Sequence, residues 1–475
     1  MQLPTHPILR AVAWLSASFV AASCSSSDSR AQAALASYQS AASANDLFGA
    51  RRALLQLVRA KDDVADYWAE LGKVQASMGR YDDAYYAFTR AYELDRSNPE
   101  LIRALAELAL RSGDITAAQT HARELEVIAP GDRWIKVVKG WAAYSDLQFE
   151  EALATSNDLL AADPSDGIAT QLKARALISL AREPEAADLL EKRVQDQPND
   201  AGSYALLAKI YEHQKDWAKV AQCSERLAAL HPEDPTVATL LVEAALRSGN
   251  VAAARAASFR LLRPQAPPQL VATVLDLWAD YWPSQQRVAD ARRLAAAAPL
   301  QQQLVYAAFL SRAGSPADAL RLAHSAAVLP VSAENAEANA VFADALWRMG
   351  NIEGAKKRFD AVLAFDPGNA TALRGRSELE LRTGNAADAI HDAQKLVTAL
   401  PDSASDRLLL ARAFSAAGQK DWADRTLWTA FQDIPADERI YGALLATKKG
   451  DVQAMNEVQA EFDRQRSAKL AKGLL

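Results

Sequence analysis

The residues of this chain that could do chemistry are few and scattered. Its six histidines share one feature, which is that no two of them lie three or four positions apart, the spacing of a helical metal pair. They are His6, His121, His213, His231, His324 and His391. Cys223 has no histidine or aspartate beside it, and we interpret it as a packed side chain rather than a reactive thiol. Adjacent acids such as Asp62 and Asp63 would diverge by roughly 100° on a helix. No glycine-rich phosphate loop is present, so no enzyme activity, metal or cofactor is predicted.

A charged pattern recurs instead. Four acidic residues each precede an arginine by four positions, and this spacing gives an ion pair within one helix worth roughly 0.2–0.5 kcal/mol. The pairs are Glu107–Arg111, Glu243–Arg247, Asp344–Arg348 and Glu378–Arg382. An arginine in the last turn also suits the helix dipole. Two interpretations stay open, namely local helix stabilisation and a ladder of charges that lines a groove for a polar or charged partner.

Three aromatic residues form a second candidate site. Trp278, Tyr281 and Trp282 are spaced by three and four positions, so they share one face of a helix. They could fill a gap between two stacks of helices that are out of register. Alternatively, they could form an aromatic patch that binds a partner protein or a sugar ring.

The elements that carry these residues repeat every 34 positions. Prolines recur at this spacing from Pro130 to Pro232 and again from Pro367 to Pro435, and glycines recur from Gly79 to Gly113. Alanines keep the same phase at Ala84, Ala118, Ala152, Ala186, Ala254, Ala319, Ala355, Ala389 and Ala423. A glycine suits the left-handed residue after a helix, and a proline stops the following helix. The period therefore predicts helical hairpins, each a first helix, a glycine turn and a second helix.

One hairpin carries a recognisable motif. Residues 68–91 read Trp68-x2-Leu71-Gly72, then Ala84-x3-Phe88, then Ala91, and this stretch resembles a tetratricopeptide repeat, a hairpin of about 34 residues. The resemblance implies an all-α solenoid, here of about twelve hairpins, wound as a right-handed superhelix. We expect units to begin near residues 65, 99, 133, 167, 201, 235, 300, 336, 370 and 404, after a degenerate unit at 31–64.

The resemblance also implies where partners bind. In this family the first helices line a concave groove, and some members hold a peptide there with a lysine and an asparagine four positions apart. That clamp is not reproduced here, so binding of a chaperone tail is not expected. The candidate groove residues are Lys73, Arg103, Glu107, Arg111, Arg175, Lys209, Glu243, Arg247, Asp344, Arg348, Arg374, Glu378, Arg382 and Arg412. If they bind a partner, reversing the charges of Arg247 and Arg348 should abolish binding and leave the fold intact.

The first thirty residues have the outline of an export signal. Arg10 precedes a short apolar run, residues 11–22, which is too short to span a membrane as a helix. The sequence Ala21-Ala22-Ser23-Cys24 resembles a bacterial lipobox, which implies cleavage before Cys24 and lipid attachment to its sulfur. An ordinary signal peptide is the alternative. Ser25 follows the cysteine, and by analogy this favours the inner leaflet of the outer membrane, facing the periplasm.

Composition limits the class of partner. The net charge is −6, which argues against a basic nucleic-acid surface, and half of the residues are hydrophobic. Two cysteines exclude a disulfide framework.

Taken together, these features predict six segments. They are a signal peptide (1–23), a flexible tether (24–30), an N-terminal array (31–266), a distorted repeat or bend (267–299), a C-terminal array (300–437) and capping helices (438–475).

The preferred hypothesis for function is a non-enzymatic scaffold for protein–protein interactions in the bacterial envelope. Its plan resembles tetratricopeptide lipoproteins of exopolysaccharide and protein-sorting systems. Two alternatives are a component that binds or exports polysaccharide and a regulatory subunit of an envelope enzyme complex. The lipid anchor would be the one attachment to the membrane.

Overall fold

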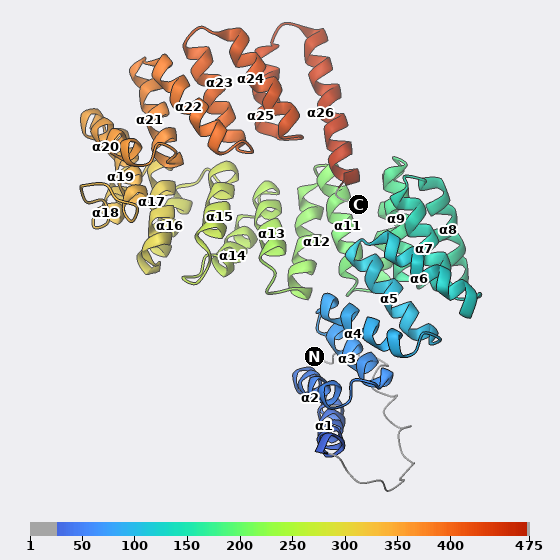
Figure 1. The fold of residues 1–475 in the computed structure, drawn as a ribbon. Helices are drawn as coiled ribbons and strands as arrows, with labels where there is room; N and C mark the ends of the chain where they lie inside the picture. Colours follow the sequence, from blue (N-terminus) through green and yellow to red (C-terminus); the bar gives the residue numbers. More distant parts are fainter. Residues whose placement is uncertain (1–25, 473–475) are drawn as a thin grey trace, which may run out of the picture. The chain divides into compact units, whose positions relative to one another are not determined.

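The structure is a computed structural model that describes residues 26–472. Within this range the chain forms 26 α-helices, and consecutive helices pack as antiparallel pairs (Figure 1). The all-α class and the helical-hairpin repeat predicted from the 34-residue period are therefore confirmed. The chain divides into two compact units, residues 1–189 and 190–475, and each is described by itself below.

The first unit holds α1 to α9 and the start of α10. Its helices are α1 (Ser26–Ser43), α2 (Leu47–Ala60), α3 (Ala65–Ser77), α4 (Tyr81–Leu94), α5 (Pro99–Ser112), α6 (Ile115–Ile128), α7 (Arg133–Ser145), α8 (Phe149–Ala162), α9 (Gly167–Ser179) and α10 (Glu183–Asp196), in which the boundary falls.

The second unit continues the same pattern. Its helices are α11 (Ala201–His213), α12 (Trp217–Leu230), α13 (Pro235–Arg247), α14 (Val251–Leu261), α15 (Pro268–Tyr281), α16 (Gln285–Ala297), α17 (Leu300–Arg312), α18 (Pro316–Ala323), α19 (Ala336–Arg348), α20 (Ile352–Phe365), α21 (Ala370–Thr383), α22 (Ala386–Ala399), α23 (Ala404–Ala416), α24 (Lys420–Asp433), α25 (Glu438–Thr447) and α26 (Val452–Lys472).

Short polar residues start many of the helices. An N-cap oxygen that accepts a backbone N–H satisfies one of the donors left over at a helix start. Asp132, for example, caps α7 by accepting from the backbone N–H of Trp134, and Asn98 caps α5, where Pro99 occupies the first position. First helices begin at residues 65, 99, 133, 167, 201, 235, 300, 336, 370 and 404, as predicted.

The predicted stops are also confirmed. Helix α6 ends at Ile128, two residues before Pro130, and α20 ends at Phe365, two residues before Pro367. Because proline lacks an N–H and clashes with the preceding turn, it fixes the length of the second helix in these units.

The turn inside the hairpin keeps its conformation where glycine is missing. Gly113 has φ +79°, in the left-handed region. One and two periods later, Leu147 and Ala181 stand at the same place in the repeat, with φ of 62° and 58°. A left-handed residue with a Cβ costs about 1–2 kcal/mol, so packing of the two helices dictates this turn.

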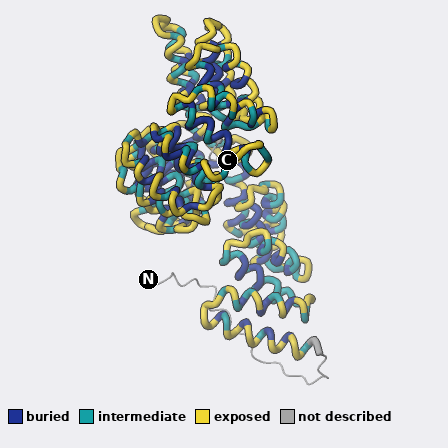
Figure 2. Tube along the Cα trace, turned by 90° about the vertical axis from the view of Figure 1, so that its left-hand side faces the viewer, coloured by how far each residue is buried: buried dark blue, intermediate teal, exposed yellow. Residues whose placement is uncertain are grey.

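The alanines that keep phase lie in the core between helices. Ala84, Ala118 and Ala152 are all 0% exposed. Where alanine is missing, Val220 and Val288 fill the equivalent buried position. Figure 2 shows buried positions recurring along the helices between exposed ones. The absence of a side chain at Gly72 also allows close packing, because a Cβ there would lie 2.9 Å from the ring of Phe88.

One segment differs from expectation. Helix α1 begins at Ser26, so residues 26–30 are helical rather than a flexible tether; Asp28 lies in its first turn and pairs with Lys61 at 2.8 Å. The distorted repeat at 267–299 forms one hairpin, α15–α16, inside the second unit. The signal segment and Cys24 lie outside the described residues.

Candidate binding groove

A large cavity of the second unit is lined by first helices. It has a volume of 1460 Å³, and its walls come almost wholly from α15, α17, α19, α21, α23 and α25. The apolar part of the lining includes Ala272, Leu304, Val305, Ala308 and Leu408. We call this cavity the groove, and its walls are first helices, as the tetratricopeptide resemblance implies for the concave face.

Ion pairs surround the apolar surface. Arg374 makes two hydrogen bonds of 2.7 Å to Asp406, whose side chain is only 1% exposed, so this pair is a fixed part of the wall. Arg312 lies 3.4 Å from Asp276. Arg412 also lines the groove, is exposed, and has no ion-pair partner among the described residues. A partner would therefore meet an apolar floor with one available guanidinium.

A smaller cavity lies where the end of the second unit meets its beginning. It has a volume of 320 Å³, and we call it the crevice. Its lining residues are Lys209, Glu212, His213, Lys215, Trp217, Glu243, Arg247, Ala436, Glu438, Phe462, Arg466, Lys469 and Leu470. They come from α11, α12, α13 and the α11–α12 turn on one side and from α25, α26 and the loop before α25 on the other.

Arg247 is the central contact of the crevice. Its guanidinium lies 3.6 Å from the ring centroid of Trp217 and 4.9 Å from that of Tyr281. It also pairs with Glu243 at 3.2 Å and with Glu438 at 2.7 Å, and its side chain is only 13% exposed. Because the charge is stacked and paired, reversing it would disturb packing, and the sequence-based test at Arg247 would not leave the fold intact.

Adjacent residues of α25 contact both cavities. Glu438 lines the crevice, and Arg439 lines the groove. Arg439 lies 3.2 Å from Asp280 of α15. Burial raises the pKa of the Asp280 carboxyl, and Arg439 opposes this rise. Burial alone would also raise the pKa of Glu438, but Lys215 and Arg247 together hold it below its ordinary value.

Six of the candidate groove residues line one of the two cavities. Arg374, Glu378 and Arg412 line the groove, and Lys209, Glu243 and Arg247 line the crevice. Of the acid–arginine ladder, Glu243, Arg247 and Glu378 line one of these two cavities, and Arg111, Arg348 and Arg382 line neither. Whether these residues bind a partner stays a prediction.

The acid–arginine pairs of the second unit differ in part from expectation. Asp344 is buried, pairs with Arg348 at 3.0 Å and accepts a hydrogen bond from Ser311, so it joins α17 to α19 and is not an accessible groove residue. Glu378 pairs with Arg348 at 2.6 Å rather than with Arg382. Arg382 is exposed in the last turn of α21. These contacts favour the interpretation in which the charges stabilise the hairpins.

The first-unit candidates make local contacts. Lys73 pairs with Glu70 at 2.8 Å, and Arg111 pairs with Glu107 at 3.6 Å. Arg103 of α5 pairs with Asp132, the N-cap of α7 in the following hairpin. Arg175 lies over the ring of Trp141 at 5.5 Å, and burial lowers its pKa.

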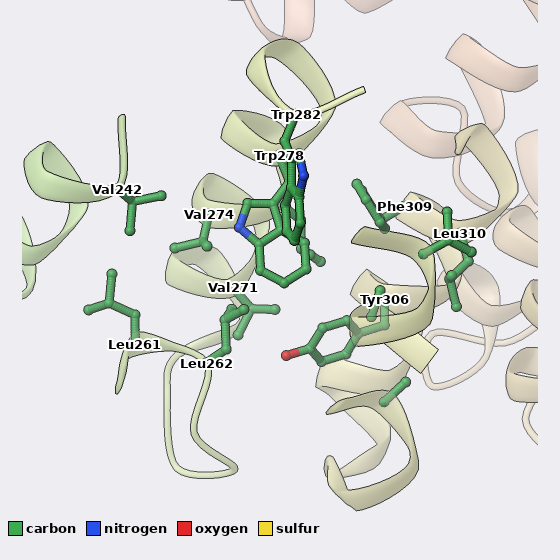
Figure 3. Packing of buried hydrophobic residues seen from close by; sticks show 14 of the residues in the cluster. Val242, Leu261, Leu262, Val271, Val274, Trp278, Trp282, Tyr306, Phe309 and Leu310 are labelled. Carbon is green, nitrogen blue, oxygen red and sulfur yellow. The ribbon is translucent and has the colours of Figure 1, made fainter. Parts of the chain in front are cut away.

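The aromatic cluster forms core rather than an exposed platform (Figure 3). Trp278 is 0% exposed and Trp282 is 4% exposed. The Trp278 indole donates a hydrogen bond of 2.9 Å to Ser258, and its ring meets Trp282 edge-on at 5.1 Å. The hypothesis of an aromatic patch that binds a partner protein or a sugar is therefore wrong for Trp278 and Trp282, because buried indoles agree only with a packing role. The third residue, Tyr281, stacks with Arg247.

Most charged residues of these cavities were missed by the sequence analysis. Among them, Asp276 and Asp280 of α15 pair with Arg312 of α17 and Arg439 of α25, and Arg439 and Asp280 are 159 positions apart. The one available signal was the four-residue spacing of Asp276 and Asp280, which places both on one face of α15. Their partners are set by how the array folds back, and no local pattern specifies that.

Other chemistry finds no support in the part of the chain that the structure describes. Cys223 is buried, as interpreted, and burial raises the pKa of its thiol to about 12. Residues 26–472 contain no group of three or more His, Cys, Asp or Glu side chains arranged to hold a metal ion. No helix in that range is both long and apolar enough to cross a membrane.

Three tetratricopeptide repeat models match the sequence. One matches residues 35–99 and 341–404, a second matches 75–136, and a third, described as the N-terminal tetratricopeptide region of Psidin, matches 133–271. Together these matches cover well over half of the chain. The chain is therefore a tetratricopeptide repeat protein, a class of generally non-catalytic scaffolds that bind proteins or peptides.

Comparison with individual proteins adds little beyond this class. No curated protein matches the sequence. Among solved structures, pilF of Pseudomonas aeruginosa is 16% identical over 46% of this chain and 98% of its own, with a TM-score of 0.34. MamA from Desulfovibrio magneticus RS-1 is 17% identical over 36% of this chain and 97% of its own, with a TM-score of 0.31. The APC/C hetero-tetramer Cut9–Hcn1 is 13% identical over 95% of this chain and 97% of that chain, also with a TM-score of 0.31. These low scores carry no argument about function.

Proposed function

We propose that the chain is a scaffold of the bacterial envelope, anchored by a lipid on Cys24, that holds a protein partner in the groove of its second unit. One observation carries the binding part of this proposal. The groove has a volume of 1460 Å³. Its walls carry apolar and charged side chains, and the first helices of six hairpins line it. Such a surface suits a segment of another protein better than a small molecule, since small-molecule sites hold about 300–1,000 Å³.

The test of partner binding is a photo-crosslinking experiment in the bacterium that makes the protein. Ala279 is an exposed alanine on the groove side of α15. Ala289 is an exposed alanine on α16 of the same hairpin and does not line the groove. A benzophenone residue replaces one or the other. Adducts with one protein from Ala279 alone are expected; equal adducts from both sites, or none from Ala279, would contradict groove binding.

The anchor requires a separate test because Cys24 lies outside the described residues. A Cys24→Ser variant should lose incorporation of labelled palmitate and should no longer sediment with the outer membrane. Cys223→Ser is the matched control, since Cys223 is buried in α12 and should not carry the lipid. Palmitate incorporation that survives in Cys24→Ser would contradict attachment at Cys24, and no incorporation in the parent protein would indicate an ordinary signal peptide.

The envelope role follows from the resemblance of residues 1–24 to a signal with a lipobox. The polysaccharide alternative loses its aromatic surface, because Trp278 and Trp282 are buried.

A further inference from the structure

The second unit returns on itself through its last hairpin. Helix α26 packs beside α11, and Arg466 donates a hydrogen bond to the backbone carbonyl of His213. Lys469 lies 3.5 Å from Glu212. Between these helices, Glu438 binds both Arg247, at 2.7 Å, and Lys215, at 3.1 Å. The end of the array is therefore fastened to its beginning by charged groups.

This closure differs from the packing of consecutive hairpins. The contacts across it are mainly polar, although Phe462 and Leu470 of α26 also lie at the crevice. Glu438 and Lys215 remain 41% and 45% exposed. Ion pairs this exposed contribute little to stability and are screened by salt. These ion pairs can therefore exchange partners at little cost in stability.

The crevice has more basic than acidic groups. Five lysine and arginine side chains line it with three carboxylates, and one of those three is Glu438. The other two, Glu212 and Glu243, belong to the α11–α13 side, where Glu243 already pairs with Arg247. If Glu438 withdraws, Lys215 and the outer side of Arg247 lose their shared carboxylate.

We propose that Glu438 occupies, within the same chain, a binding site for a carboxylate of an acidic partner segment, and that such a segment displaces Glu438 from Lys215 and Arg247. This inference deepens the proposed scaffold function and rests on it. Displacement frees α25 from α13. Because Glu438 lines the crevice and its neighbour Arg439 lines the groove, displacement of α25 would change both cavities.

The geometry favours a peptide carboxylate over other anions. The position is filled in the structure by a carboxylate, which accepts from one guanidinium and one ammonium group. Trp217 also lines the crevice and is partly exposed, so its ring offers apolar surface to the rest of a peptide. The volume of 320 Å³ lies at the lower end of the range for ligand sites.

The test uses the full chain and a fluorescein-labelled oligoglutamate peptide, with binding followed by fluorescence anisotropy. Glu438→Gln keeps the size of the side chain and removes its charge, so oligoglutamate should bind roughly fivefold more tightly than to the parent protein. Adding Lys215→Gln should cancel this gain. Glu457→Gln is the control, because Glu457 is exposed on α26 and does not line the crevice.

Three outcomes would overturn the inference. The first is equal affinity of oligoglutamate for the parent protein and for Glu438→Gln. The second is a gain in oligoglutamate affinity in Glu457→Gln equal to that in Glu438→Gln. The third is binding of a single-stranded oligothymidylate more tightly than oligoglutamate, which would assign the crevice to phosphates. The proposed function fails separately, through the crosslinks at Ala279. Adducts at Ala279 without an effect of Glu438→Gln would leave the groove as a binding site and remove the displacement at Glu438.

Discussion

Arg247 shows how much one side chain can do in a repeat protein. Its guanidinium stacks between Trp217 and Tyr281 and pairs with two carboxylates, so it joins four elements of the second unit. A lysine could not reproduce this contact, because an ammonium lacks the flat face that stacks and the fork that pairs. At this scale, charged residues of the repeats behave as packing residues as much as binding residues.

Trp278 gives a prediction about stability at the same scale. The Trp278→Ala substitution should lower the free energy of unfolding by about 3–5 kcal/mol, because it leaves a cavity in a core where the indole is 0% exposed. The measurement is urea denaturation followed by circular dichroism. Trp422→Ala is the matched control, since Trp422 is 55% exposed and its loss should cost far less. Equal losses in the two variants would contradict the packing described for Trp278.

Cys223 gives a prediction about reactivity. Burial raises the pKa of this thiol to about 12, so it stays protonated and shielded at pH 8. Iodoacetamide should label Cys223 slowly in the native protein and rapidly in urea, as measured by peptide mass spectrometry. Fast native labelling would indicate that α12 opens readily or that the thiol is activated.

At the scale of the element, the turn between paired helices is the most constrained feature. Glycine occupies it in several repeats, yet Asn45, Leu147, Ala181 and Lys215 adopt the same left-handed conformation elsewhere. The helices on either side are packed through buried alanines, and their separation allows no other turn. Strain at these turns is therefore balanced by the apolar packing of each hairpin.

A prediction follows for these turns. Ala181→Gly should stabilise the chain by about 1 kcal/mol, because glycine relieves the left-handed strain at φ 58°. The reverse substitution, Gly113→Ala, should destabilise it by a similar amount, because φ there is +79° although no neighbouring atom would clash. Thermal unfolding measures both effects. An unchanged midpoint in both variants would argue that the turns relax at no cost.

At the scale of the whole molecule, the two compact units are built from the same repeat but differ in the range of their charged contacts. Within the first unit, the candidate residues make contacts inside one hairpin or with the next, such as Arg103 with Asp132. Within the second unit, α25 and α26 return to α11, α13 and α15 and create two cavities. Residues 438–475 were expected to be capping helices. In α26, Arg466 contacts the carbonyl of His213 and Lys469 contacts the carboxylate of Glu212, so this helix also packs on α11.

The closure of the second unit should be sensitive to salt and to acid. The pKa of Glu438 is lowered in the folded state, so its stabilising contribution is fully present above its ordinary value of 4.5. That contribution is lost as the pH falls through the lower folded value. Spin labels at Gln214→Cys and Ser467→Cys, in a Cys24→Ser background, should move apart at low pH and in high salt.

A charge exchange provides the control for this experiment. Glu212→Lys alone should lengthen the distance between the labels, because it places two ammonium groups together, and Glu212→Lys with Lys469→Glu should restore it. A distance that stays constant through both changes would show that the closure does not depend on these ion pairs.

The sequence by itself determined the local architecture. The 34-residue period placed the starts of the first helices, the glycine turns and the buried alanines, because each depends on residues within one hairpin or its neighbour. It also identified Arg374, Glu378 and Arg412, which line the groove in the structure. The exposed-platform interpretation of Trp278 and Trp282 was wrong, because periodicity shows which residues share a face but not what covers that face.

Only the tertiary structure decided where the array closes and which charges meet. Arg247 and Glu438 are 191 positions apart, and neither carries a local mark of the other. Their contact depends on the small rotation that each hairpin adds to the one before it, summed over α13 to α25. Side-chain packing at every interface sets that rotation, so the crevice and the wall of the groove belong to the folded unit rather than to any repeat.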